Sequence, residues 1–329
     1  MLLADTSRAA FNDVTSSTGN SFAVDVLTPP TGLTADGGGA ATIDWTATSD
    51  IYASGHRVFR GSSPGGPYSQ IAEVTPRAAV SYVDTPAEGT YYYVSRAFAG
   101  NWESVDSSEV SATVYEAQLT GSWQTDLTHT AATGNDRLLL FVASNEESAV
   151  SSPTLSSVTY GGQALTKVTD GQVTPFSITA SLEIWILGEA GIAAAADTTF
   201  VPTWTATPQA PLYVHAVIDD TNQATPTGSV VTGFGPGDTP NPVPMAPVSP
   251  APGDIVIAAA TAGEFGAYTP QNGFSLGVNH DDGVHTSTLG TAQIEADGSA
   301  VTASMLFTGV NPPLVRRQVV TALVVKVKD

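Results

Sequence analysis

The apolar residues of this chain come in short alternating runs, separated at frequent intervals by glycine, proline, asparagine and aspartate. Alternation with a period of two buries one face of an extended strand, whereas an amphipathic helix needs a period near 3.6. The sequence also holds 31 glycines and 22 prolines, which favour turns over regular structure. We therefore predict an all-β fold built from sandwiches. We expect the most helix-like run, residues 188–196, to be a loop or one turn.

Composition narrows the range of partners. The chain has 11 lysines and arginines against 31 aspartates and glutamates, a formal net charge of -20. Because this acidity repels phosphate backbones, we expect no nucleic-acid partner. No run of about 18 apolar residues occurs, so we expect no membrane span. The absence of cysteine excludes disulfides, thiolate metal sites and cysteine nucleophiles, and it fits an exported protein.

Composition shifts divide the chain into three segments. Residues 1–28 form an amino-terminal extension, residues 29–116 a compact unit, and residues 117–329 a larger β-sandwich or jelly-roll unit. Seven prolines between Pro236 and Gly253 predict an extended connection. We interpret it as a long loop joining two halves of one sandwich, and the alternative is a hinge between two smaller domains.

The middle segment carries a tryptophan in its second apolar run, Ala41-Thr42-Ile43-Asp44-Trp45, and a tyrosine-rich run, Gly89-Thr90-Tyr91-Tyr92-Tyr93-Val94-Ser95-Arg96-Ala97. Together with the turns between its runs, this pattern resembles a fibronectin type III domain over nearly all of residues 29–116. The resemblance implies a sandwich with Trp45 in its core and a spacer or binding role. We expect Tyr91 to make the corner hydrogen bond to the backbone.

The larger segment is predicted to contain about ten strands. We place them near residues 137–144, 157–160, 164–168, 180–187, 198–204, 212–218, 254–260, 287–294, 300–307 and 315–327. Gly161-Gly162 is expected to form the turn of a hairpin within residues 157–168. This hairpin, with Leu182-Glu183-Ile184-Trp185-Ile186-Leu187, is similar to β-sandwich modules of bacterial surface and phage proteins. That resemblance implies no activity.

The amino-terminal extension has apolar residues that the middle segment does not account for. Phe22, Val24 and Val26 fall on one face of an expected strand, and Phe11 precedes them. The stretch resembles the start of the mature chain in camelysin-like biofilm fibre proteins. That resemblance implies a strand that completes a sheet of the next subunit, giving a head-to-tail homopolymer. The alternatives are a strand docked on its own chain and a disordered leader.

Two patterns suggest chemistry that turns explain equally well. Residues 61–65 match G-x-S-x-G, but they lie in an expected hairpin turn rather than in the strand-turn-helix of a hydrolase. Asn279, Asp281 and Asp282 imitate the opening of a calcium loop, with His280 and His285 beside them. The twelfth position would be Gly290 instead of the required glutamate, so a polar turn is the alternative to a calcium site.

Aromatic residues of the larger segment offer a candidate sugar platform. Trp185 shares a strand face with Glu183, and Trp204 and Tyr213 would need to lie beside it. The alternative is that these rings are core residues of the sandwich. His56, His129 and His215 are isolated in the sequence, and we expect each to be a half-exposed strand residue.

We find no catalytic constellation and predict a protein that is not an enzyme. The favoured hypothesis is an extracellular structural subunit of a surface fibre, assembled through the amino-terminal strand. One alternative is a secreted adhesin or carbohydrate-binding module with a glycan or cell-surface ligand. Another is a phage virion decoration or tail component, because similar modules occur there.

Overall fold

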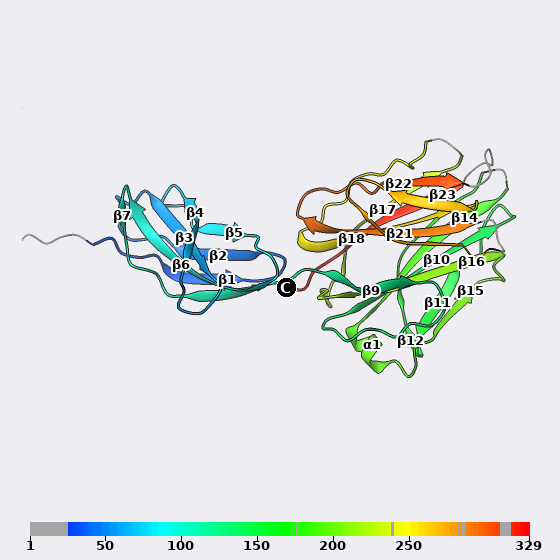
Figure 1. Ribbon diagram of the computed structural model, residues 1–329, viewed down its shortest axis with the longest axis horizontal. Coiled ribbons are helices and arrows are strands. Elements are labelled where there is room, and N and C mark those ends of the chain that lie inside the picture. The colour runs from blue at the N-terminus through cyan, green and yellow to red at the C-terminus, as the bar shows by residue number, and fades with distance from the viewer. Residues whose placement is uncertain (1–25, 176, 238–239, 282, 284–286, 310–316) are drawn as a thin grey trace, which may run out of the picture.

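The computed structural model describes residues 26–175, 177–237, 240–281, 283, 287–309 and 317–329. It is all-β, as predicted, and its strands form two units that follow one another along the chain (Figure 1). Strands β1 to β8 pair only among themselves in the described sheets, as do strands β9 to β23.

The first unit is a sandwich of two antiparallel sheets. One sheet has the order β1-β2-β5, and the other has the order β4-β3-β6, with β7 and β8 both paired to β6. Its strands are β1 (Thr31–Asp36), β2 (Ala41–Thr46), β3 (Gly55–Gly61), β4 (Ser69–Val74), β5 (Ser81–Asp84), β6 (Gly89–Ala99), β7 (Trp102–Glu103) and β8 (Val110–Val114).

The core of this unit forms where alternate residues of the two sheets meet. Trp45 is 5% exposed and packs in one cluster with Ile43, Val58 and Tyr93. The Tyr91 hydroxyl donates to the Ala87 carbonyl at 3.0 Å, so the predicted corner hydrogen bond is confirmed. These contacts are the ones that the fibronectin-like pattern predicts for the tryptophan and the first tyrosine.

The second unit contains two five-stranded antiparallel sheets, ordered β13-β14-β10-β16-β9 and β17-β23-β18-β21-β20. Smaller sheets, β12-β11-β15 and β19-β22, accompany them. The strands are β9 (Gln118–Gln124), β10 (Leu138–Glu147), β11 (Leu155–Tyr160), β12 (Gln163–Ala164), β13 (Thr166–Val173), β14 (Thr179–Gly188), β15 (Phe200–Trp204), β16 (Ala210–Asp219), β17 (Thr227–Gly235), β18 (Pro252–Ala262), β19 (Gly266–Pro270), β20 (Ser275–His280), β21 (Thr288–Asp297), β22 (Met305–Gly309) and β23 (Gln318–Val325).

Three apolar layers hold these sheets together. The two five-stranded sheets face each other across a core that includes Leu140, Ile184 and Ile257. The outer face of the first sheet packs against β11 and β15 through Phe141 and Phe200. The outer face of the second sheet packs in the same way against β19 and β22. Because β10, β14, β18 and β23 are buried on both faces, they read in the sequence as nearly continuous apolar runs.

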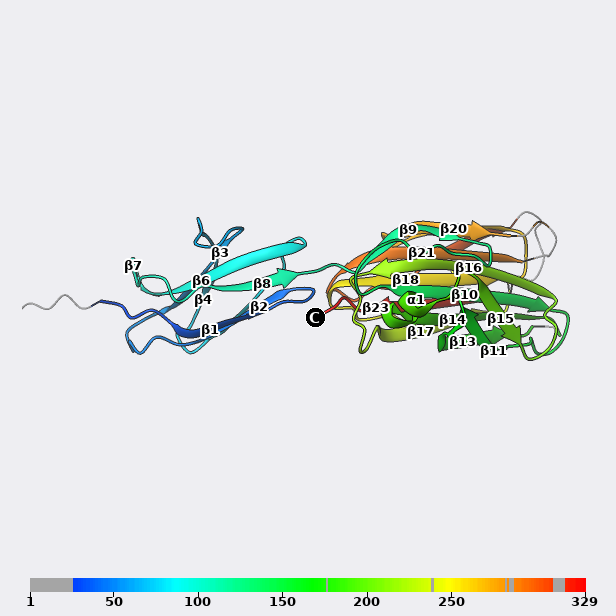
Figure 2. The ribbon, with the colours of Figure 1, turned by 90° about the horizontal axis from the view of Figure 1, so that it is seen from below.

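The two halves of this unit repeat one topology. In the first half, β9, β10, β13, β14 and β16 form the large sheet, while β11 pairs with β15 outside it. In the second half, β17, β18, β20, β21 and β23 take the same places in the same order, and β19 pairs with β22. The unit therefore contains two copies of one seven-stranded arrangement, with β12 added in the first half. The copies pack against each other through their larger sheets (Figure 1), and they overlap in the view of Figure 2.

The proline-rich segment lies within the second half, where it joins β17 to β18 and packs on the outer face. Val243 and Val248 are buried in its outer core, and the Asn241 amide accepts from Phe307 N–H at 3.1 Å and donates to the Phe307 carbonyl at 2.8 Å. The interpretation of this segment as a loop joining two halves is therefore wrong, because β17, which precedes it, already pairs with β23 in the sheet of the second half.

Some local expectations need correction. Residues 189–194 form the short helix α1 (Glu189–Ala194) where we expected a loop or one turn, because Ile192 packs into the outer core of the first half. Strands β9, β17, β19 and β20 were not predicted, since they are edge or outer strands with few buried positions. The predicted hairpin is confirmed: Tyr160 pairs with Gln163 around Gly161-Gly162, both at positive φ.

The two units meet at a joint built from small residues. Tyr115 N–H donates to the Gly38 carbonyl at 2.9 Å, and Ala117 N–H donates to the Gly253 carbonyl at 2.8 Å. A Cβ on Gly39 would lie 1.7 Å from the Pro252 carbonyl oxygen, so only glycine fits there. The described carboxyl terminus also lies at this joint (Figure 1).

Candidate functional site

The candidate sugar platform does not form an open surface. Trp185 is 6% exposed and lies in the core layer between the first large sheet and its outer sheet. Trp204 and Tyr213 do lie together, with the Trp204 Nε1–H donating to the Tyr213 hydroxyl at 2.9 Å, and both are half-buried. The platform interpretation is therefore wrong for Trp185, because the indole is covered by the outer sheet.

A buried carboxylate occupies the same layer. Glu183 is 2% exposed, and its Oε1 accepts from Leu155 N–H at 2.7 Å. Its Oε2 accepts from Trp185 Nε1–H at 3.3 Å and lies 2.8 Å from Lys167 Nζ. Burial alone would lower the pKa of Lys167, but hydrogen bonds to Glu183 and Asp170 outweigh it and raise that pKa. Each carboxylate oxygen of Glu183 has a partner inside the sandwich. The hydrogen bond from Leu155 links β14 of the large sheet to β11 of the outer sheet.

Two histidines that are far apart in the sequence meet in this layer. His129 is 4% exposed and His215 is 0% exposed, so the expectation of half-exposed strand residues is wrong, as it is for His56 at 0%. His215 Nε2 lies 2.7 Å from the Asp126 carbonyl, which only accepts, so Nε2 carries the proton. His215 Nδ1 then accepts from His129 Nδ1–H at 2.8 Å. Burial lowers the pKa of both rings, that of His215 to about 4.

The calcium-like segment is built differently from a cation loop. The Asn279 side chain accepts from Tyr268 N–H at 2.8 Å and donates to the Tyr268 carbonyl at 3.0 Å, so it ties β20 to β19. Asp281 accepts from Gly283 N–H at 3.1 Å, as in a polar turn, and Asp282 lies outside the described residues. Asn279 is therefore not a cation ligand, because both ends of its amide are already used.

The described residues offer no other candidate metal site. The described part of the chain contains no group of three or more histidine, aspartate or glutamate residues placed to hold a metal ion. The G-x-S-x-G run begins at the last residue of β3 and continues into the turn before β4. In this turn Gly65 N–H donates to Glu109 at 2.7 Å.

A cavity of about 360 Å³ lies at the joint between the two units. Residues 85–87 of the first unit line one side, and Glu116, Asp254, Glu295 and Asp297 line the other. Burial raises the pKa of Asp254, whose oxygens accept from Val327 N–H and Ala251 N–H. The Asp254 carboxylate therefore accepts hydrogen bonds from backbone N–H groups at the joint.

The candidate assembly strand lies almost wholly outside the described residues, which include neither Phe11, Phe22 nor Val24. Val26 is 69% exposed, whereas its neighbour Leu27 is 3% exposed and packs against the first unit. Thr28 N–H then donates to Asp50 at 2.6 Å. Leu27 and Thr28 are therefore built into the first sandwich, a role that sequence reasoning missed because a single leucine at a segment boundary carries no periodic signal.

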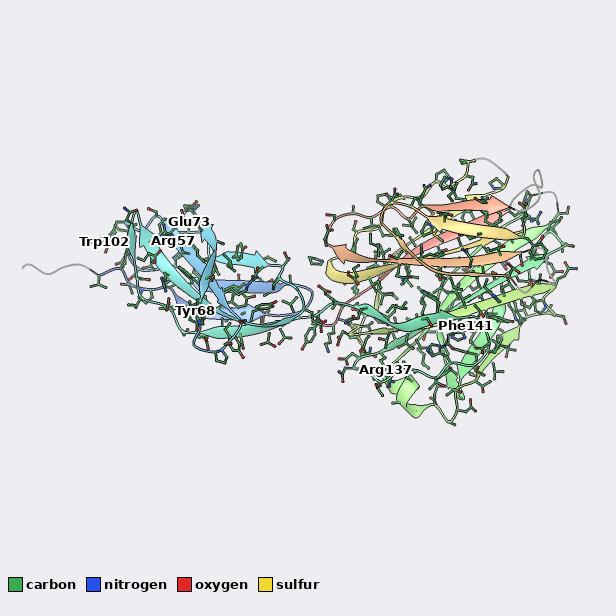
Figure 3. All side chains as sticks on the ribbon, in the orientation of Figure 1. Arg57, Tyr68, Glu73, Trp102, Arg137 and Phe141 are labelled. Carbon is green, nitrogen blue, oxygen red and sulfur yellow. The ribbon has the colours of Figure 1, made fainter. Side chains whose placement is uncertain are left out.

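Exposed apolar side chains gather around this entry point. We define the distal tip as the five exposed residues Val26, Ile51, Tyr52, Trp102 and Val105. Val26 directly precedes Leu27, and Ile51 and Tyr52 directly precede Ala53, in the small buried cluster of Leu27, Ala53 and Ala97. Trp102 lies at the end of the first unit farthest from the second (Figure 3). Sequence reasoning missed this tip, although Trp102 stands in a polar stretch, Gly100-Asn101-Trp102-Glu103, where no core strand would bury it.

No protein-family model and no curated protein matches the chain. A solved structure described as an Fn3-like protein from Clostridium thermocellum matches 30% of this chain and 100% of its own chain, with 30% sequence identity and a TM-score of 0.24. On the basis of its two-sheet arrangement and the Tyr91 corner described above, the first unit is a fibronectin-like β-sandwich segment.

The described residues also contain no helix with the length and apolar character that a membrane crossing requires. The fibronectin-like, all-β architecture is of a kind that is typically non-catalytic.

Proposed function

We propose that this protein is an extracellular structural subunit, assembled into a fibre by its amino-terminal segment. The fibronectin-like sandwich acts as a spacer, and the double sandwich forms the body. The observation that carries the proposal is the direction of the chain at Val26: it enters at the distal tip, at the end of the first unit away from the second (Figure 1). A contact between copies made at this end joins them lengthwise.

The arrangement of polar groups supports a structural role. Glu183, His129 and His215 hold sheets together, and Asp254 holds the joint. Among the described strands β4 pairs only with β3, so its other edge offers backbone groups to which a strand from a neighbouring subunit can add. Because the chain has 11 basic residues against 31 acidic ones, contacts between copies depend on backbone pairing and apolar side chains more than on ion pairs.

Electron microscopy of the full chain across a concentration series tests this proposal. We expect regular filaments for the native chain and none after deletion of residues 1–25. This deletion is better than one ending at residue 28, because it keeps Leu27 and Thr28, which belong to the first sandwich. Filaments that still form from the shortened chain would refute strand exchange.

A second candidate function is binding of a glycan, as in an adhesin. It is favoured by Trp102, whose 55% exposure suits stacking on a sugar ring. A glycan array probed with the native chain and with Trp102→Ala tests it, with Trp204→Ala as the control for the half-buried pair. Signal lost only in Trp102→Ala supports a glycan site at the distal tip.

A further inference from the structure

Residues 327–329 lie at the joint and contact both units (Figure 1). Lys328 N–H donates to the Asp220 carbonyl at 2.8 Å, so the segment is hydrogen-bonded to the second unit. The first unit lies on its other side, because a Cβ on Gly38 would be 3.6 Å from both Asp329 Cα and the Lys328 carbonyl oxygen. The segment is therefore placed to control how the two units are held together.

The Lys328 ammonium group joins the second unit to the connection between β8 and β9. Its Nζ lies 2.6 Å from Asp220 Oδ1 and 3.3 Å from Asp136 Oδ2. The same Nζ lies 4.1 Å from the centroid of the Tyr115 ring, which is within the range of a cation–π interaction. One ammonium group thus binds two carboxylates of the second unit and an aromatic ring of the connection.

Tyr115 is bound to both units at once. Its N–H donates to the Gly38 carbonyl of the first unit at 2.9 Å. Its partly buried side chain packs against the core between the two large sheets of the second unit, and Lys328 lies over the ring. Because the backbone and the ring of one residue are held by different units, the first unit cannot turn on the second without disturbing this contact.

The two carboxylates that hold Lys328 come from residues in the left-handed backbone region. Asp136 has φ 52° and Asp220 has φ 54°. Glycine adopts this conformation at the lowest cost, so the turns alone do not require aspartate. Burial would lower the pKa of Lys328, but hydrogen bonds to Asp220 and Asp136 outweigh it and raise that pKa. The two side chains therefore have a use in binding the ammonium group.

We propose that Lys328, with Asp136, Asp220 and Tyr115, is an ionic clasp that fixes the first unit on the second, and that the joint becomes a hinge when the clasp is released. The clasp is open to solvent at one side, since the Lys328 and Asp136 side chains are 19% and 43% exposed. Salt screens charges that reach water, so the relative orientation of the two units depends on ionic strength. The inference concerns the isolated molecule and does not depend on fibre formation.

Single-molecule Förster energy transfer between one dye on each unit tests this inference. The chain has no cysteine, so Ser62→Cys and Ser299→Cys, both at exposed positions, give two unique labelling sites. At low salt we expect one narrow distribution of transfer efficiency for the labelled chain, and a broader, shifted one when Lys328→Met is added. Raising the salt to about 1 M, where the screening length is about 3 Å, should broaden the first distribution and leave that of Lys328→Met unchanged.

Matched variants separate the clasp from general effects of charge and packing. Lys326→Met removes a positive charge two residues away, Tyr115→Phe keeps the ring, and both should keep the narrow distribution. Asp220→Asn should resemble Lys328→Met, and circular dichroism checks that the sheets persist in each variant.

A narrow distribution for Lys328→Met at low salt would overturn the proposal. So would a distribution of the labelled chain that does not respond to salt, which is measured without any change at the clasp. Absence of filaments leaves both results unaffected, so this proposal and the proposed function fail separately.

Discussion

At the scale of single residues, buried polar groups distinguish the two halves of the double sandwich. Leu138 and Ile255 are the first residues of the two central strands that pair with both neighbouring strands. Aligned on these residues, the second half has Gly290 where the first has Glu183, and Ala322 where it has His215. The first half therefore carries an ion pair and a histidine pair where the second carries small apolar residues. The ion pair and the histidine pair each have a measurable effect on stability.

The ion pair should be asymmetric in its contribution to stability. Lys167→Met leaves the Glu183 carboxylate, 2% exposed, without its cation, and is expected to cost about 3 kcal/mol of unfolding free energy. Glu183→Gln should cost about 1 kcal/mol, because the Lys167 side chain, 30% exposed, turns to solvent. Urea unfolding of both variants and of the double variant measures this. A larger cost for Glu183→Gln would contradict it.

The histidine pair should make stability depend on pH. Burial keeps the folded-state pKa of His129, His215 and His56 below the unfolded value, so the unfolded chain binds more protons as pH falls below about 6.5. With the pKa of His215 at about 4, its contribution is full above about pH 6.5 and is lost as pH falls toward about 4.

At about pH 5 we expect a loss of about 2 kcal/mol from His215. Denaturant unfolding at about pH 7.5 and pH 5 measures it. The variant with His129→Asn and His215→Asn serves as the reference, and its stability should change less between the two values. A native chain with the same pH slope as this variant would exclude the pair as the cause.

At the scale of elements, strand β6 organises the fibronectin-like sandwich. It pairs with β3, β7 and β8, it places Tyr93 in the core, and it starts at the corner made by Tyr91. The alternation of this strand also turns Tyr92 to the opposite face. Adjacent tyrosines therefore have different roles, which makes them a matched pair for substitution.

Tyr91→Phe removes the hydroxyl that reaches the Ala87 carbonyl and is expected to destabilise the first unit by about 1 kcal/mol. Tyr92→Phe removes a hydroxyl from the other face and should be nearly neutral. Thermal unfolding followed by the near-ultraviolet signal of the first unit compares the two. Equal effects of both substitutions would show that the corner hydrogen bond contributes nothing.

At the scale of the whole molecule, the joint between the units depends on a close backbone contact. The Gly39→Val substitution would place a side chain against the Pro252 carbonyl, and we expect the two units to separate while each keeps its fold. Small-angle scattering should show a larger radius of gyration and a broader distance distribution than in the native chain.

Gly237→Ala is the control for this experiment, since a Cβ there would meet no atom within 4 Å. Circular dichroism of both variants checks that the sheets persist. An unchanged scattering curve for Gly39→Val would mean that the joint adapts to the side chain.

The sequence by itself was sufficient for the all-β class, the core position of Trp45, the Tyr91 corner and the Gly161-Gly162 turn, because each depends on local periodicity or on turn chemistry. Only the tertiary structure decided the duplicated halves and the meeting of His129 with His215. These features join residues that are far apart along the chain. They depend on which sheets pack together, and a period of two along a strand says which side chains share a face but not what that face will meet.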